Sequence, residues 1–90
     1  MRWKSIIQQC PDRSYFGRFG TLQKHHCLHG PYRTKAEQDG LYVMLTVQEH
    51  RDLHDKGIND LELKMIAERA WLDKYGNVDD FIKRYGRNFL

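Results

Sequence analysis

The chain lacks the features that direct a protein to a membrane or into a secretory route. Its longest unbroken apolar stretch runs only from Leu41 to Leu45, whereas a membrane-spanning helix needs about 20 apolar residues. The opening residues 1–7 contain no apolar signal-peptide core. We therefore expect a cytoplasmic protein that has no membrane partner.

Cysteine is also scarce, since Cys10 and Cys27 are the only two. Two cysteines without close spacing do not form a zinc motif, and a disulfide between them is not expected in a reducing compartment. We interpret both as small buried thiols, and a metal-ligand role is the alternative.

Internal repeats, low-complexity tracts and long linkers are missing as well. A chain of 90 residues then forms a single domain, residues 1–90, with a modest core. In a domain of this size a bound metal can contribute to folding.

The net charge of +3 is unevenly distributed. Residues 1–36 hold seven basic side chains and one acidic side chain, whereas residues 37–90 hold eight basic and eleven acidic ones. Clustered cations suit a polyanion such as nucleic acid. The alternative is that these are ordinary solvated side chains.

A helix is predicted after residue 45. The spacing from Thr46 to Glu49 is that of a capping box, in which the two side chains bind free backbone donors at a helix start. The helix continues through about Lys56, and Gly57 is placed to end it.

Two candidate strands precede this helix, at residues 21–28 and 41–45, and a single helical turn closed by Gly40 is expected between them. Strands and helix together predict a β-β-α unit over about residues 15–57. A helical extension over about residues 58–90 follows, with two helices. The predicted fold class is therefore α+β.

The first helix of the extension is expected to begin near Asn59 and to end at Gly76, and the second to follow Asn77. The predicted inward residues of the first helix are Leu61, Met65, Ala70 and Trp71. In the second helix they are Val78, Phe81, Ile82 and Tyr85.

All five histidines lie between positions 25 and 54. His50 and His54 are four residues apart on the predicted helix, so their rings share a face and can hold one metal ion. His25 and His26 are neighbours on a predicted strand, where adjacent side chains point to opposite faces. One of the two can therefore bind a metal while the other does chemistry.

These segments resemble the HNH, or His-Me finger, nucleases, whose ββα-metal unit binds one divalent ion. The resemblance is closest to small phage and prophage HNH proteins. It covers nearly the whole chain, through LQKHHCLHG at 22–30, GLYVMLTVQEH at 40–50, ELKMIAERAW at 62–71 and FIKRYGRNFL at 81–90.

The resemblance implies roles for four histidines. His25 and His50 become metal ligands, His54 a third ligand, and His26 the general base that takes a proton from water. The implied cofactor is one divalent ion, which is Mg²⁺, Mn²⁺, Ni²⁺ or Zn²⁺. His29 is expected to be a loop residue or a phosphate contact.

The family's central asparagine, which orients the base histidine, has no counterpart in residues 37–43. Asp39 is the polar substitute that we expect to accept the ring proton of His26. Asn59 stands where relatives often have a further histidine ligand, and it either reaches the ion or caps the following helix. The predicted phosphate contacts are Arg18, Lys24, Arg33 and Lys35.

The expected function is a divalent-metal-dependent DNA endonuclease, encoded by a phage or prophage and acting in the cytoplasm of a bacterial host cell. The alternative is a non-catalytic binding protein on the same scaffold. It is then a DNA-binding module or a partner of a host protein, such as an inhibitor of a bacterial defence nuclease of the anti-CRISPR kind. A structural metal module is the third option.

Overall fold

The computed structural model describes residues 3–90. Within these residues the chain forms a small compact α+β domain with two antiparallel strands and four α-helices, so the predicted fold class is confirmed. The elements are β1 (Leu22–His26), η1 (Gly30–Tyr32), α1 (Arg33–Asp39), β2 (Tyr42–Thr46), α2 (Val47–Lys56), α3 (Asp60–Lys74) and α4 (Val78–Tyr85), where η1 is a short 3-10 helix.

The two strands pair antiparallel, with Leu22 opposite Thr46 and His26 opposite Tyr42. Both strands were expected, and the observed first strand is shorter than predicted. The connection between them contains α1, a longer helix than the single turn that the sequence indicated. Gly40 ends it in the left-handed region at φ 77°, and an added Cβ there would lie 2.5 Å from the backbone oxygen of Lys4.

Helix α2 follows β2 without a loop because the predicted capping box is present. The Thr46 side chain accepts a hydrogen bond from the Glu49 backbone N–H at 3.1 Å. In return, Glu49 Oε1 accepts one from the Thr46 backbone N–H at 2.8 Å. This cap fixes the turn from strand to helix, and Gly57 closes the helix in the left-handed region at φ 72°.

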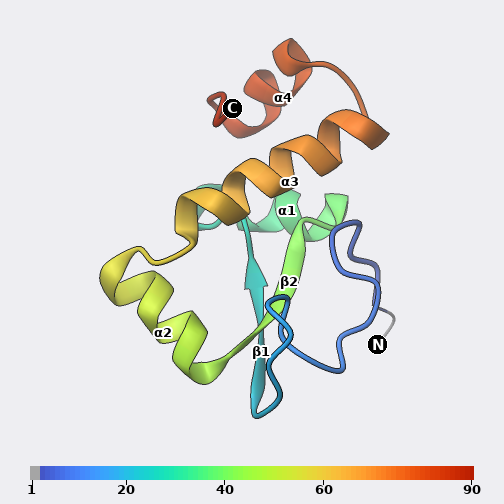
Figure 1. The fold of residues 1–90 in the computed structure, drawn as a ribbon. Coiled ribbons are helices and arrows are strands. Elements are labelled where there is room, and N and C mark those ends of the chain that lie inside the picture. Colours follow the sequence, from blue (N-terminus) through green and yellow to red (C-terminus); the bar gives the residue numbers. More distant parts are fainter. Residues whose placement is uncertain (1–2) are drawn as a thin grey trace.

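Figure 1 shows α3 lying across the molecule, with α4 on one side of it and α1 and the strands on the other. The core lies where these layers meet. It is formed by Leu41 just before β2 and by buried residues of β2, α2, α3 and α4, namely Val43, Leu45, Leu53, Leu63, Ala67, Trp71, Phe81 and Tyr85. The segment before β1 runs beside β2 (Figure 1) and is bonded to it through the Tyr15 N–H and the Met44 carbonyl.

The buried face of α3 agrees with the predicted one at Trp71 and differs at Leu61. Leu63, Ala67 and Trp71 are buried at a spacing of four residues, whereas Leu61 is 57% exposed. A spacing of four keeps these three on one stripe of the helix, and Leu61 falls about 200° away from Leu63. In α4, Phe81 is buried and Ile82 is exposed, so only part of the predicted face packs inward.

None of the helices in the described chain has the length and apolar character needed to cross a membrane.

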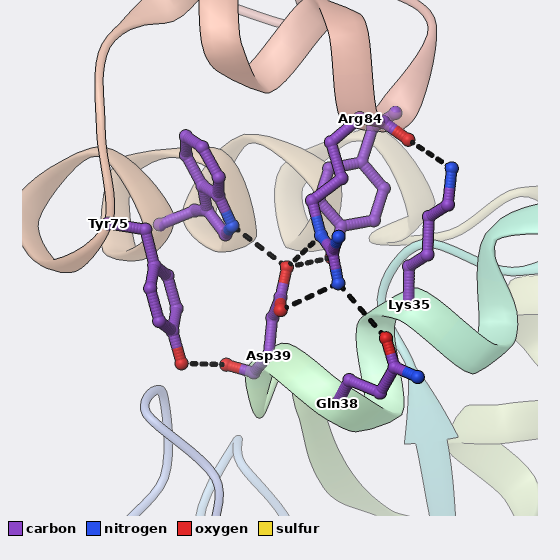
Figure 2. Close-up of polar contacts among 7 residues, drawn as sticks. Lys35, Gln38, Asp39, Tyr75 and Arg84 are labelled. Carbon is purple, nitrogen blue, oxygen red and sulfur yellow. Dashed lines mark hydrogen bonds and ion pairs between the residues drawn. The ribbon is translucent and has the colours of Figure 1, made fainter.

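A buried carboxylate joins α1 to the two C-terminal helices (Figure 2). Asp39 Oδ2 accepts hydrogen bonds from Trp71 Nε1 at 2.9 Å, from Arg84 Nε at 2.6 Å and from the Tyr85 hydroxyl at 2.6 Å. Its Oδ1 accepts a further bond from Arg84 Nη2 at 2.9 Å. Burial raises the pKa of Tyr85, and the hydrogen bond to Asp39 raises it further.

This network corrects one prediction. Asp39 was expected to orient His26, but its side chain is bonded to α3 and α4 instead. The physical reason is that three strong donors converge on one carboxylate in a nearly dry site, where an ionised acceptor needs them all.

Replacing Asp39 tests this structural role. We expect Asp39→Ala to lower the free energy of unfolding by about 3 kcal/mol, because it leaves a cation and two buried donors without an acceptor. Asp73→Ala is the matched control, since Asp73 is exposed on α3 and surface changes stay within about 0.5 kcal/mol. Urea unfolding measures both, and equal stability of the two variants would contradict the role.

Candidate metal centre

Three histidines from two elements converge on one point. His25 comes from β1, and His50 and His54 come from α2. One nitrogen of each lies within 4.8 Å of the others. The ring centroid of His25 lies 5.2 Å from that of His50 and 5.8 Å from that of His54. These are three of the residues that the sequence selected as ligands, and the structure brings them together.

Backbone connections explain the convergence. Because β1 pairs with β2, and β2 runs directly into α2, the helix turns back toward β1 (Figure 1). His50 and His54 share a helix face, and their Nε2 atoms lie 3.1 Å apart. Two nitrogens that bind one tetrahedral zinc at about 2.0–2.1 Å lie about 3.3 Å apart. The spacing of the two rings therefore fits a shared ion.

A neighbouring amide orients one of these rings. Gln23 Oε1 lies 2.7 Å from His50 Nδ1, and an amide oxygen only accepts, so Nδ1 carries the proton. The lone pair of the His50 imidazole then lies on Nε2, the atom that faces His54. Gln23 lies two positions before His25 on β1, so both side chains point to the same face of the strand. The i, i+2 spacing of Gln23 and His25 on the strand is the sequence signal for this contact.

His25 is buried and keeps an unpartnered nitrogen. Its exposed fraction is 2%, and within residues 3–90 its Nε2 has no hydrogen-bond partner. Burial, and after it the nearby His50, His29 and His54, lowers the pKa of His25 from 6.5 to about 3. Burial followed by His54 and His29 also lowers the pKa of His50. Neutral imidazoles are the form that binds metals, so the cluster fits a metal ion.

The neighbouring His26 faces a carboxylate instead of the cluster. Its Nε2 lies 2.7 Å from Glu37 Oε1, and Lys24 Nζ lies 3.2 and 3.3 Å from the two oxygens of Glu37. The hydrogen bond from His26, helped by Lys24, lowers the pKa of Glu37. Glu37 therefore has the contact with His26 that was predicted for Asp39.

The helix geometry of α1 explains this exchange. Two residues along an α-helix correspond to a rotation of about 200°, so Glu37 and Asp39 lie on opposite sides of α1. Glu37 meets His26 of β1. Asp39 faces α3 and α4 (Figure 2). Both residues are acidic, so residue type alone does not separate them, and the contact of Glu37 was not predicted.

His26 and the three clustered histidines border one cavity of about 330 Å³. Its lining consists of the residues Lys24, His25, His26, His29, Gly30, Arg33, His50 and His54. Two of the predicted phosphate contacts, Lys24 and Arg33, therefore line the same hollow as the histidines.

The other two predicted phosphate contacts lie elsewhere. Lys35 Nζ donates to the backbone carbonyl of Arg84 at 3.1 Å (Figure 2). Arg18 pairs with Glu49 at 3.2 Å. Neither lines the cavity. Each is bonded to a neighbouring element of the fold, and we withdraw both as members of the site.

No family model, curated protein or solved structure matches this chain. Function is therefore inferred from the side chains of the site.

His29 stands at the border of the cluster. Its ring centroid lies 5.9 Å from His25 and 5.8 Å from His54, and its Nε2 is 3.0 Å from Asp60 Oδ1. Burial raises the pKa of Asp60, but hydrogen bonds from His29 and Lys64 outweigh it, so the pKa is lowered overall. His29 is thus held at the cavity wall by an ionised partner.

Asn59 and the cysteines complete the set of candidates. Asn59 stands at the N-cap position of α3, as predicted, in the left-handed region at φ 66°, but its side chain makes no capping bond. Cys27 is buried as expected, and burial raises the pKa of its thiol to about 12. Cys10 is exposed, contrary to the prediction, and both thiols are free.

Removing the Gln23 acceptor tests the orientation of His50. We expect Gln23→Leu to weaken Zn²⁺ or Ni²⁺ binding by about 10–100-fold, because outer groups that fix a ligand ring have effects of that size. Gln48→Leu is the control, since Gln48 is exposed on α2 and bonded to Asp52. Isothermal titration calorimetry measures both, and an unchanged affinity in Gln23→Leu would refute the role.

The burial of His25 predicts an acid-sensitive apo protein. In the presence of a chelator, the unfolded chain takes up a proton on His25 near pH 6.5, whereas the folded chain does so only near pH 3. The contribution of His25 is then fully present above pH 6.5 and is lost as the pH falls toward 3. Urea unfolding at pH 7.5 and 5.0 should show a larger loss for the natural protein than for His25→Gln. Equal losses would contradict the assignment.

Proposed function

We propose that this protein is a divalent-metal-dependent DNA endonuclease of the HNH, or His-Me finger, type, encoded by a phage or prophage. The observation that carries the proposal is the cavity that joins three convergent histidines to a fourth with a carboxylate partner. The chain order β1, β2, α2 supports it, because the ligands come from the first strand and the helix, as the resemblance implies.

His26 is the general base of the proposed reaction. When its Nε2–H donates to Glu37, the lone pair of the neutral ring lies on Nδ1, which can take a proton from an attacking water. Glu37 stabilises the imidazolium that forms and keeps the ring in place. The His26 side chain is 12% exposed, so its access to water is through the cavity that it lines.

His25, His50 and His54 would hold the ion through three imidazole nitrogens. Bound there, a divalent ion supplies Lewis-acid stabilisation of the charge that develops on the phosphate and the leaving oxygen. A donor set made of imidazoles suits Zn²⁺ or Ni²⁺ better than Mg²⁺, which prefers carboxylate and water oxygens. Lys24 and Arg33 hold the flanking phosphates of the DNA at the same hollow.

A second candidate is a non-catalytic binder of DNA or of a bacterial host protein on the same scaffold. What favours it is the missing asparagine in residues 37–43, together with the Lys24 cation that shares Glu37 with His26. For a protein of this kind, the His26→Ala variant should still bind DNA or the partner, and neither the variant nor the natural protein should cut DNA. A third option, a structural metal module, predicts unfolding on chelation.

Cleavage of plasmid DNA tests the proposal. With Ni²⁺, Zn²⁺, Mn²⁺ or Mg²⁺ supplied in turn, we expect nicking by the natural protein and a loss of at least 100-fold in His26→Ala, because general-base catalysis contributes about 10²–10⁴-fold. Glu37→Gln should lose less, since it keeps a hydrogen-bond acceptor for the ring and removes only the charge.

Gln38→Glu is a matched control on the same helix, because Gln38 is exposed and faces Arg84 instead of His26. It should retain activity. A folded protein that leaves DNA intact with every metal would overturn the nuclease proposal, and binding of DNA by gel shift in the same samples would then favour the non-catalytic candidate.

A further inference from the structure

A second hollow adjoins the histidine cavity and has a different lining. Its volume is about 250 Å³, and its walls include Leu28, Tyr32, Tyr85 and Phe89. His29 lines both this hollow and the histidine cavity, so the two hollows are neighbours. The nuclease chemistry proposed above uses none of the aromatic residues.

The aromatic walls are held in a fixed shape. The rings of Tyr32 and Tyr85 lie edge to face, with centroids 6.0 Å apart, and the Tyr85 hydroxyl is bound to Asp39. Gly86 lies under the Tyr32 hydroxyl with φ 85°, and an added Cβ there would collide with that hydroxyl. The positive φ of Gly86, which lines the hollow, therefore favours glycine at this position.

Two cations stand at the same hollow. The Arg87 guanidinium carbon lies 5.0 Å from the centroid of the Phe89 ring, and Lys64 Nζ lies 5.8 Å from it. Lys64 is paired with Asp60 at 2.9 Å, whereas Arg87 has no acidic partner among residues 3–90. The hollow therefore combines flat apolar walls with an excess of positive charge.

We propose that this hollow is a subsite for one nucleotide, with the base against the partly exposed rings of Tyr32 and Phe89 and its phosphate bound by Arg87 and Lys64. Base stacking on aromatic side chains, next to cations that bind the backbone, is the common way to hold an unpaired strand. The volume is just below the roughly 300 Å³ at which pockets for drug-sized ligands begin, so it suits a single nucleotide.

The identity of the ligand follows from this pairing of surfaces. An apolar peptide side chain would make no ionic contact with Arg87. A bare anion would make no contact with the aromatic rings. Naming the nucleotide as part of a DNA strand rests on the proposed function. In that case a single-stranded stretch passes His29, with one phosphate at the histidines and the neighbouring base in the aromatic hollow.

The test is a nuclear magnetic resonance titration of the full chain with thymidine 5′-monophosphate in the presence of EDTA. We expect amide shifts at Gly86, Arg87 and Phe89. Arg87→Gln should weaken binding at least fivefold, and Tyr32→Leu should do so as well. Arg69→Gln, an exposed cation on α3, should leave binding unchanged. Thymidine and inorganic phosphate should each bind more weakly than the nucleotide.

Three results would overturn the subsite: no shifts at these amides, equal binding of inorganic phosphate, or unchanged binding in Arg87→Gln. The metal-free assay separates this inference from the nuclease proposal. A protein that binds the nucleotide and cuts no DNA keeps the subsite and loses the nuclease. A protein that cuts DNA and shows no shifts keeps the nuclease and loses the subsite.

Discussion

The carboxylate of Asp39 is the point on which the arrangement of the helices depends. It accepts bonds from Trp71 of α3 and from Arg84 and Tyr85 of α4, so a single side chain of α1 ties together three helices. Fixing one side of α1 also fixes the other side, where Glu37 meets His26. Tyr85, held by the same carboxylate, forms a wall of the second hollow. A residue of each hollow is thus linked, directly or through α1, to this partly buried ion pair.

The histidine cluster carries an energetic cost that a metal would relieve. A buried imidazole with an unpartnered nitrogen, as His25 has, lacks a hydrogen bond that water gave it in the unfolded chain, which costs about 1–3 kcal/mol. Protonation of His25 does not relieve this cost, because the nearby histidines lower the pKa of His25 further. A ligand that accepts electron pairs from all three rings satisfies them at once. A metal bound at this cluster would therefore also stabilise the fold.

Several features were predictable because they depend on neighbours in sequence. The capping box from Thr46 to Glu49 and the glycine after Lys56 fixed the ends of α2, and local hydrogen bonds alone are enough to do so. The spacing of His50 and His54 placed their rings on one face for the same reason. By contrast, the buried stripe of α3 was predicted wrongly at Leu61, because which apolar face turns inward depends on what packs against it.

By itself, the sequence determined the order of strands and helices, the helix boundaries at residues 46–57 and the spacing of the histidines. Only the tertiary structure decided which acidic side chain of α1 binds which partner. Glu37 and Asp39 are both acidic and two residues apart, so composition cannot separate them, whereas a rotation of about 200° on α1 sends one to His26 and the other to Arg84. The second hollow is likewise a tertiary feature, because its walls come from residues as distant as Tyr32 and Phe89, which meet only when α4 packs against α3.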